Sequence, residues 1–454
     1  MALQVISLIG IIIAIAFNCW SVYKGLGLPM STLISCIIVW VTSAQDIQVQ
    51  WDVAGETIGS TCVRMLFLFM FGTILGVVYV ESGAIASLGR AFFSPVKKIK
   101  NPTWRRIGLL AAFFIIRFIV GLSGIDNMAV MVFMVALVTV LFKEMDAPRK
   151  YANACLMVAG TISTFMPSVP TMLNEIVPMF LPGYTASSQA AVRWIFCILF
   201  VVGSVFWLNK MIGKDIANGE RYVGAKGMDV GDLEDDTIKR PHWILTLLPL
   251  ILIYVLYNWN SWNPNLYAFD GWTSLALGTC LATILFFPYW KKKGAPDGRP
   301  FFGYFIDQTN AAAIRIPLYY MIGYALATAV TGSAGWVLIS NFCNWMATTM
   351  NPAVGFGIAS FILVPIGSSA MMINCTLANE VFCPAGLSIA SAGTLLIVAQ
   401  TVLDTLPNSP GMIMQADLTE TPMKVCYPPI FKTTVLLTGV IYILNIILAA
   451  IGII

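Results

Sequence analysis

Long apolar runs separated by short polar segments make up most of this 454-residue chain. Windows of about 19 residues, the length that suits a membrane helix, predict spans at residues 3–23, 28–44, 60–80, 151–182, 190–209, 243–260, 271–290, 315–334, 385–422 and 428–452. A helix of about 20 apolar residues crosses the roughly 30 Å hydrocarbon core of a bilayer. The pattern therefore predicts an all-α polytopic membrane protein.

Two further apolar stretches, residues 107–142 and 352–384, are each interrupted by a polar segment. The interruptions read GLSGIDN at residues 121–127 and PIGSSAMMIN at residues 365–374. Each arm of the first stretch has about 15 residues, roughly 23 Å of helix, which is shorter than the hydrocarbon core. Because basic residues flank both of its ends, we expect a re-entrant hairpin that enters and leaves on one side. The second stretch predicts another hairpin of this kind.

Proline pairs interrupt two of the predicted spans. Pro167 and Pro170 lie in TFMPSVPTMLN, and Pro407 and Pro410 lie in DTLPNSPGMIM. Proline lacks an N–H and its ring clashes with the carbonyl four residues earlier, so neither helix can run unbroken through its pair. Backbone groups freed in this way are tolerated inside a membrane only where they are buried in protein or line a wet cavity. Both spans are therefore predicted to be broken helices.

The positions of Lys and Arg predict the orientation of the chain. With both hairpins re-entrant and the N-terminus outside, nearly all basic residues fall in cytoplasmic loops, as the positive-inside rule requires. These loops lie at residues 24, 90–106, 143–150, 210–240, 291–299 and 424–432. The outer connections hold almost no basic residues and lie at residues 45–58, 183–189, 258–270 and 335–351. Both termini are then predicted to lie outside.

The same layout divides the chain into two halves that share one order of elements and run in opposite directions. Residues 1–209 and residues 243–454 each contain five spans and a hairpin, and a cytoplasmic linker at residues 210–242 joins them. FGTILGVVYVESGA at residues 71–84 has a weak echo in YALATAVTGSAG at residues 324–335. Inverted repeats with discontinuous helices are typical of secondary transporters, which bind their solute near the middle of the membrane.

Composition and charge exclude several other classes of protein. The chain is 58% hydrophobic and 11% charged, with a mean hydropathy of +0.82, which is outside the range of soluble domains. A net charge of only +4, with the basic residues in short loops, argues against nucleic-acid binding. The ten Cys show no metal-like spacing. Since the one His leaves no nucleophile and base set, neither a cofactor nor an enzymatic activity is expected.

The hairpin tips and the broken helices predict the solute site, because both expose backbone groups in mid-membrane. Helix N-termini suit a carboxylate, whereas carbonyls and hydroxyls suit a cation or a polyol. The predicted solute-binding residues are mostly neutral hydrogen-bonding groups: Ser123, Gly124 and Asn127 from the first tip; Thr164, Ser168, Thr171 and Asn174 from the first break; Gly367, Ser368, Ser369 and Asn374 from the second tip; and Thr405, Asn408 and Ser409 from the second break.

Carboxyls at membrane depth are the candidates for ion coupling, because burying them is costly and usually serves a function. Asp126 and Asp404 are the predicted proton-coupling residues. The alternative interpretation is structural: Asp404 caps the broken helix, and Asp126 pairs with Arg117 inside the hairpin. Glu175 lies further toward the outer end of its span and is expected to face water.

Three stretches of the chain resemble the gluconate permease (GntP) family within the wider ion transporter superfamily. They are FGTILGVVYVESGA, the segment from FKEMDAPRKYANACLM to FMPSVPTMLNEIVP at residues 142–178, and LDTLPNSPGMIM at residues 403–414. The chain departs from the family pattern at the second tip, PIGSSAMM, and at the second break, PNSPG, which lacks the family's histidine. It also departs at Glu175, where gluconate carriers are mostly neutral.

The resemblance implies proton-coupled symport of a small organic anion such as a sugar acid, across the cell's inner (cytoplasmic) membrane. It also implies a homodimer in which a mobile transport domain of hairpins and broken helices moves against a scaffold, as in elevator-type carriers. A sodium-coupled carrier of a carboxylate or amino acid is the nearest alternative, because carbonyls and hydroxyls also bind Na⁺. A passive channel would need a continuous polar face along several helices, which the chain does not show.

Overall fold

The computed structural model describes residues 1–24, 26–124, 127–224, 239–290, 323–364, 368–403, 405, 412, 415–416 and 419–454. Every regular element in this part of the chain is a helix. Five helices are long and apolar enough to cross a membrane, or up to seven when each of two bent pairs counts as one span. The prediction of an all-α membrane protein is therefore confirmed.

The helices lie before and after the predicted linker at residues 210–242, into which α9 extends as far as Ala217. The first half contains α1 (Ala2–Tyr23), α2 (Leu28–Thr42), α3 (Ile47–Glu81), α4 (Ala84–Lys97), α5 (Pro102–Gly121), α6 (Asn127–Met145), the 3-10 turn η1 (Arg149–Tyr151), α7 (Ala152–Phe165), α8 (Met172–Phe180) and α9 (Ala190–Ala217). The second half contains α11 (Trp243–Trp262), α12 (Gly271–Trp290), a helix at Gly323–Thr331, α14 (Trp336–Thr349), α15 (Pro352–Leu363), α16 (Ser368–Leu377), η3 (Ala378–Phe382), α17 (Ile389–Leu403), α19 (Met423–Ile430), η4 (Phe431–Leu436) and α20 (Leu437–Ala450).

Five of the ten predicted spans do not correspond to a single long apolar helix in the part of the chain that the structure describes. Helices α2 and α17 have only 15 residues each. The span predicted at residues 151–182 is divided into α7 and α8, of 14 and 9 residues. The spans predicted at residues 60–80 and 315–334 belong to the two bent pairs.

Several segments predicted as connections are helical instead, among them residues 424–432, which α19 and η4 cover. Residues 45–58 were expected to be an outer connection, but α3 begins at Ile47, because the Asp46 carboxylate caps it by accepting hydrogen bonds from the N–H groups of Gln48 (2.8 Å) and Val49 (3.3 Å). The 35 residues of α3 give a helix about 52 Å long. Similarly, α4 extends into the predicted loop 90–106 and α14 occupies the predicted connection 335–351.

Both bent pairs fall at the two similar sequence segments noted above. The last part of α3, Leu66–Glu81, meets α4 at 65°, and the helix Gly323–Thr331 meets α14 at 80°. Gly83 stands at the first bend with φ +71°, a conformation that costs a non-glycine residue about 1–2 kcal/mol. The second bend is formed by the glycine-containing turn at residues 332–335.

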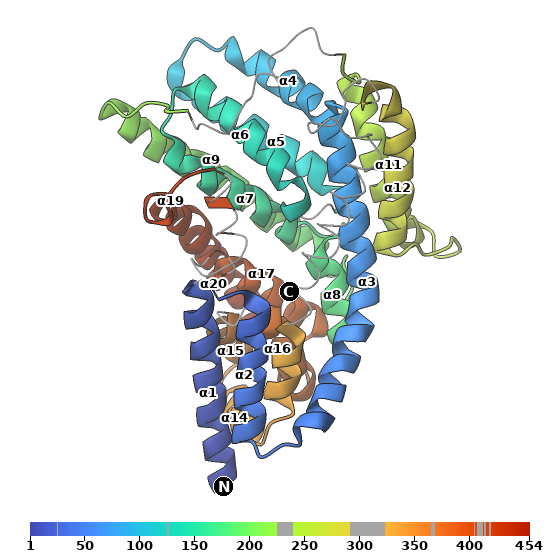
Figure 1. Ribbon diagram of the computed structural model, residues 1–454, viewed down its shortest axis with the longest axis vertical. Coiled ribbons are helices and arrows are strands. Elements are labelled where there is room, and N and C mark those ends of the chain that lie inside the picture. The colour runs from blue at the N-terminus through green and yellow to red at the C-terminus, as the bar shows by residue number, and fades with distance from the viewer. Residues whose placement is uncertain are drawn as a thin grey trace.

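Each bend packs on the first helix of the other half. At the first bend, α4 packs on α11, and the Tyr79 hydroxyl donates to the Thr246 carbonyl at 2.5 Å. At the second bend, α14 packs on α1, and the Gly335 N–H donates to the Ser7 hydroxyl at 2.8 Å. Figure 1 shows α4 with α11 at one end of the molecule and α14 with α1 at the other, with α3 running between them.

Other helix contacts come in matching pairs. Helix α5 packs on α9 and α15 packs on α20, while α7 packs on α9 and α17 packs on α20. Helices α5 and α6 lie against each other as a hairpin, and a 2.6 Å ion pair between Lys97 and Glu144 joins the segments that flank its open end. Its arms have 20 and 19 residues, longer than predicted, because α5 already begins at Pro102. Arm length therefore no longer distinguishes a re-entrant hairpin from two spans.

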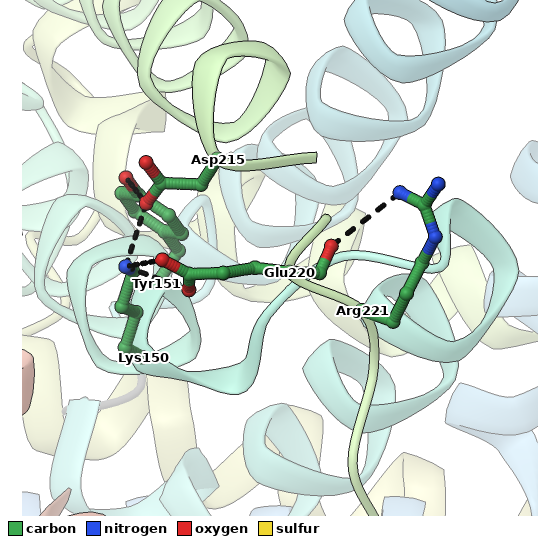
Figure 2. Close-up of polar contacts among 5 residues, drawn as sticks. All are labelled: Lys150, Tyr151, Asp215, Glu220 and Arg221. Atoms are coloured by element: carbon green, nitrogen blue, oxygen red, sulfur yellow. Dashed lines mark hydrogen bonds and ion pairs between the residues drawn. The ribbon is translucent and has the colours of Figure 1, made fainter. Parts of the chain in front are cut away.

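A partly buried ion cluster joins η1 to the end of α9 (Figure 2). The Lys150 ammonium lies 2.6 Å from an Asp215 oxygen and 2.8 Å from a Glu220 oxygen, and the Tyr151 hydroxyl donates to Asp215 at 2.7 Å. Burial lowers the pKa of Lys150, but the hydrogen bonds and charges of the two carboxylates outweigh it, so this pKa lies above its ordinary value of 10.5. The resulting stabilisation is present in full below that pH and is lost as the pH rises past the raised pKa.

We expect Lys150→Met to lower the free energy of unfolding by about 1–2 kcal/mol, because the partly buried Asp215 and the exposed Glu220 lose their cation. Chemical unfolding of the detergent-solubilised protein at pH 7 measures this change. Lys97→Met is the control, since the more exposed Lys97–Glu144 pair should contribute at most about 0.5 kcal/mol. Equal losses in the two variants would contradict a stabilising cluster.

Candidate functional site

Six residues without helical structure separate α7 from α8 and contain Pro167 and Pro170. The chain turns sharply here: Ser168 has φ +57°, and the Thr171 N–H donates to the Val169 carbonyl at 2.8 Å. Pro167 cannot donate a helical hydrogen bond, and the Pro170 ring excludes the carbonyl that a helix would place against it. This segment, residues 166–171, is the first break.

The first hairpin tip packs directly on the first break. Gly124 has φ +69°, and a Cβ added to it would lie 2.5 Å from the Pro170 carbonyl oxygen. A Cβ on Gly121 would lie 2.9 Å from the Met166 sulfur. The Ser123 hydroxyl turns inward and donates to the Val120 carbonyl at 2.6 Å. The tip therefore approaches the break backbone to backbone, at a position where only glycine fits.

A fully buried guanidinium, Arg193 on α9, binds the carbonyl end of α7. Its Nη2 donates to the carbonyls of Thr164 (3.4 Å) and Met166 (3.2 Å). Thr164 lies in the last turn of α7 and Met166 directly follows the helix, so neither carbonyl has a further helical N–H available. Positive charge at this end also complements the helix dipole.

The same guanidinium reaches both flanks of the break. Its Nη2 donates to the Asn174 side-chain oxygen on α8 at 2.8 Å, and its Nη1 donates to the Tyr184 hydroxyl and the Ala186 carbonyl, both at 3.2 Å. Arg193 forms no ion pair with any residue that the structure describes. The buried cation is therefore held by neutral acceptors.

Two amides occupy further carbonyls of the first break. Asn174 donates to the carbonyls of Met166 (3.0 Å) and Val169 (2.8 Å). Asn258 on α11 donates to the carbonyl of Ser168 at 2.8 Å. Together with Arg193, these side chains satisfy the carbonyls of residues 164, 166, 168 and 169 from within the chain. The amide of Asn174, a predicted solute ligand, is fully engaged in this way.

The start of α8 is open by comparison. Thr171 is the N-cap residue but makes no capping hydrogen bond, and its hydroxyl has no partner although the residue is only 8% exposed. The first three N–H groups of α8 have no acceptor within the described residues. The other two predicted residues here, Thr164 and Ser168, are half-buried, and the Thr164 hydroxyl makes only a long 3.5 Å contact with the Gly160 carbonyl.

The second hairpin lies against the first broken helix. Helix α16 packs on α8, α17 packs on α7, and the Asn379 amide donates to the Phe180 carbonyl at 2.8 Å. Asn374 is fully buried; its side-chain nitrogen is 3.5 Å from the Ser360 carbonyl, and its side-chain oxygen has no partner. Thr405 is buried and accepts a hydrogen bond from Thr434 at 3.0 Å.

The remaining predicted site residues are only partly placed. Asn127 begins α6, and Ser368 and Ser369 begin α16. The residues outside the described part of the chain are Asp126, Gly367, Asp404, Asn408 and Ser409. The first tip, the first break and the second hairpin thus come together, whereas the second break is placed only at Thr405.

Two ionisable residues near the first break have protein partners. Glu175 was expected to face water, but it is half-buried against the start of α12: a Cβ on Gly271 would lie 2.6 Å from a Glu175 oxygen, and the Tyr257 hydroxyl hydrogen-bonds to Glu175. Arg117 is fully buried on α5 and donates to the Ala159 carbonyl (3.1 Å) and the Ser163 hydroxyl (2.8 Å) of α7.

Arg193 and Asn258 are the site residues that the sequence pattern did not reveal. Arg193 begins an apolar run, so it resembles an interfacial residue at a span end. Its position inside the fold depends on the segment that returns from α8, which carries Tyr184 and Ala186. An arginine within an apolar span that follows a proline-broken helix was the available signal.

The chain matches no protein-family model, and no curated protein matches it either. The resemblance to gluconate permeases therefore stays a prediction.

We expect Gly124→Ala to destabilise the fold by about 3 kcal/mol or more, because the new Cβ meets the Pro170 backbone in addition to the strain of positive φ. The control is Gly219→Ala, since Gly219 has φ +91° but no atom within 4 Å of its added Cβ; it should lose only about 1–2 kcal/mol. Equal losses in thermal unfolding of the two variants would mean that the tip does not press on the break.

We expect Arg193→Lys to lower stability by about 2–4 kcal/mol, because an ammonium cannot replace a planar fork that serves acceptors on both flanks of the break. Arg106→Lys is the matched control: Arg106 is part-buried and donates from Nε to the Asn209 side-chain oxygen at 3.1 Å, so its loss should stay below about 1 kcal/mol. Arg193→Lys at wild-type stability would contradict the assigned role.

Proposed function

We propose that this protein is a secondary active transporter that carries a small hydrophilic organic anion together with H⁺. The supporting observation is the asymmetry of the first break. The carbonyls of residues 164, 166, 168 and 169 are already bound by Arg193, Asn174 and Asn258, whereas the start of α8 offers free N–H groups and the unpartnered Thr171 hydroxyl. A helix N-terminus suits a carboxylate, and a hydroxyl suits the polyol part of a sugar acid.

The same asymmetry favours proton coupling over sodium coupling. A Na⁺ site in mid-membrane is usually built from the carbonyls of unwound helices. At the first break the chain itself occupies three of these acceptors, the carbonyls of residues 166, 168 and 169. We therefore propose Asp126 and Asp404 as the carboxyls that bind and release the proton, with sodium coupling as the alternative that the transport assay tests.

We propose further that the chain forms two inverted repeats, an architecture typical of secondary transporters. The bends at 65° and 80° fall at similar sequence segments. Each bend rests on the first helix of the other half, and the contacts of α5 and α7 with α9 match those of α15 and α17 with α20. Reciprocal contacts of this kind are expected from a two-fold axis. We propose that the hairpins and broken helices move together as an elevator-type transport domain.

The resemblance to gluconate permeases supplies the finer proposals. These are a gluconate-like substrate, a homodimer, and an inner membrane location with both termini outside. They are supported by the ESGA, PSVP and DTLP segments. The departures at PIGSSAMM, PNSPG and Glu175 leave the identity of the organic anion to experiment.

We expect Thr171→Val to weaken gluconate binding by about 1–3 kcal/mol without lowering stability, because the lost hydroxyl has no partner in the unloaded protein. The affinity is measured as the concentration dependence of the thermal shift. Thr246→Val is the control, since the Thr246 hydroxyl donates to the Trp243 carbonyl at 2.6 Å, far along the chain from the break; it should lower stability and leave affinity unchanged. The reverse pattern would remove Thr171 from the site.

We expect Asp404→Asn to abolish gluconate accumulation driven by a pH gradient in proteoliposomes while exchange across the membrane partly survives. The reason is that an amide cannot release the proton that couples the gradient to the solute. Glu144→Gln, at an exposed ion pair, should accumulate as the wild type does. Wild-type uptake that follows a Na⁺ gradient and ignores the pH gradient would overturn proton coupling.

A further inference from the structure

A cavity of about 640 Å³ opens between α4 and the start of α11, away from the first break. Its polar lining comes from Ser87, Arg90, Ser94 and Lys98 on α4 and from His242 and Trp243 on α11. No Asp or Glu lines it among the residues that the structure describes. The proposed transport mechanism makes no use of this basic cavity.

The polar face of α4 is directed at the cavity by helical spacing. Ser87, Arg90, Ser94 and Lys98 are three or four residues apart, which places them on one face of the helix. The opposite face is buried and includes Ile85, Leu88 and Phe93. The packing of α4 thus leaves its two hydroxyls and two cations together on the side that faces α11.

The start of α11 contributes further donors. His242 caps the helix, since its Nδ1 accepts a hydrogen bond from the Ile244 N–H at 3.4 Å, and its ring lines the cavity. The positive end of the α11 dipole lies here too. Cations, hydroxyls and a helix N-terminus therefore converge on one volume, which is the chemistry that binds a phosphate group.

Next to the cavity, three exposed apolar side chains form a row along α11, which is called the apolar track. Ile244, Leu248 and Ile251 are 53%, 46% and 50% exposed, and their spacing of four and three residues places them on one outer face of this candidate span. Trp243, at the mouth of the cavity, is a residue type typical of the membrane interface. A phosphate held in the cavity would have room for an attached acyl chain along this track.

We infer that this cavity binds the headgroup of an anionic phospholipid, with one acyl chain along Ile244, Leu248 and Ile251. Basic pockets between membrane helices are known binding places for such headgroups. The cavity stands beside the first bend, where α4 packs on α11. A bound lipid would therefore contact both halves of the chain where they meet.

The test is a thermal-shift titration of the purified full-length protein with dioctanoyl phosphatidylglycerol, dioctanoyl phosphatidylcholine and glycerol 3-phosphate. We expect saturable stabilisation by phosphatidylglycerol and little by the other two, since one lacks the net charge and the other lacks the chains. The double variant Arg90→Gln/Lys98→Gln should bind phosphatidylglycerol about thirtyfold more weakly, because each of the two cations contributes about 1 kcal/mol to the binding free energy near the membrane surface.

Two further variants separate the cavity from general charge attraction. Lys100→Gln/Arg105→Gln removes two cations of the same region that do not line the cavity, and should keep wild-type affinity. Ser94→Trp fills the cavity without changing charge and should abolish the shift. Equal losses in both double variants, or an unchanged shift in Ser94→Trp, would overturn the inference. A full shift with glycerol 3-phosphate would also overturn it, in favour of a soluble phosphate site.

Discussion

A helix that breaks inside a membrane leaves carbonyls that must find donors, and this constraint shapes the centre of the protein. At the first break Arg193 binds the carbonyls of residues 164 and 166, Asn174 binds those of residues 166 and 169, and Asn258 binds that of residue 168. An unmade hydrogen bond in hydrocarbon costs several kcal/mol per group, so the break, the return segment after α8 and helix α9 can only fold together. The N–H groups at the start of α8 have no acceptor within the described residues, and under the proposed function this is the side of the break that receives the solute.

Many of the helices can be predicted from the sequence, because a membrane helix requires a continuous apolar run that a local window detects. Apolar runs of sufficient length predict α1, α9, α11, α12 and α20, and a proline pair predicts the separation of α7 from α8. The hydropathy window did not predict helices α4 and α14, because their polar residues lower the mean hydropathy of these segments to that of a loop. The extra length of α3 depends on one capping residue, Asp46, which a hydropathy window cannot weigh.

The candidate site could be predicted from the sequence only where glycine or proline determines the conformation of the backbone. The glycine and proline positions at the first tip and the first break are such places, and Gly124 meets Pro170 there. Residues that act across the fold were not readable: Arg193 begins an apolar run, and Glu175 looked solvent-facing although it lies against Gly271. Whether a polar side chain binds solute or holds the chain depends on partners that are distant in sequence, as the fully engaged amide of Asn174 shows.

The reciprocal bends have a consequence for biogenesis. The hydroxyl of Ser7 emerges from the ribosome almost at once, yet its partner, the Gly335 N–H, is synthesised more than three hundred residues later. Helix α1 already has a native neighbour in α2, where the Ser7 and Ser43 hydroxyls are 2.6 Å apart, but its contact with α14 forms only after α14 has been inserted. A chain that stops before α14 would keep the contact of α1 with α2 and lack the one that joins α1 to the second bend.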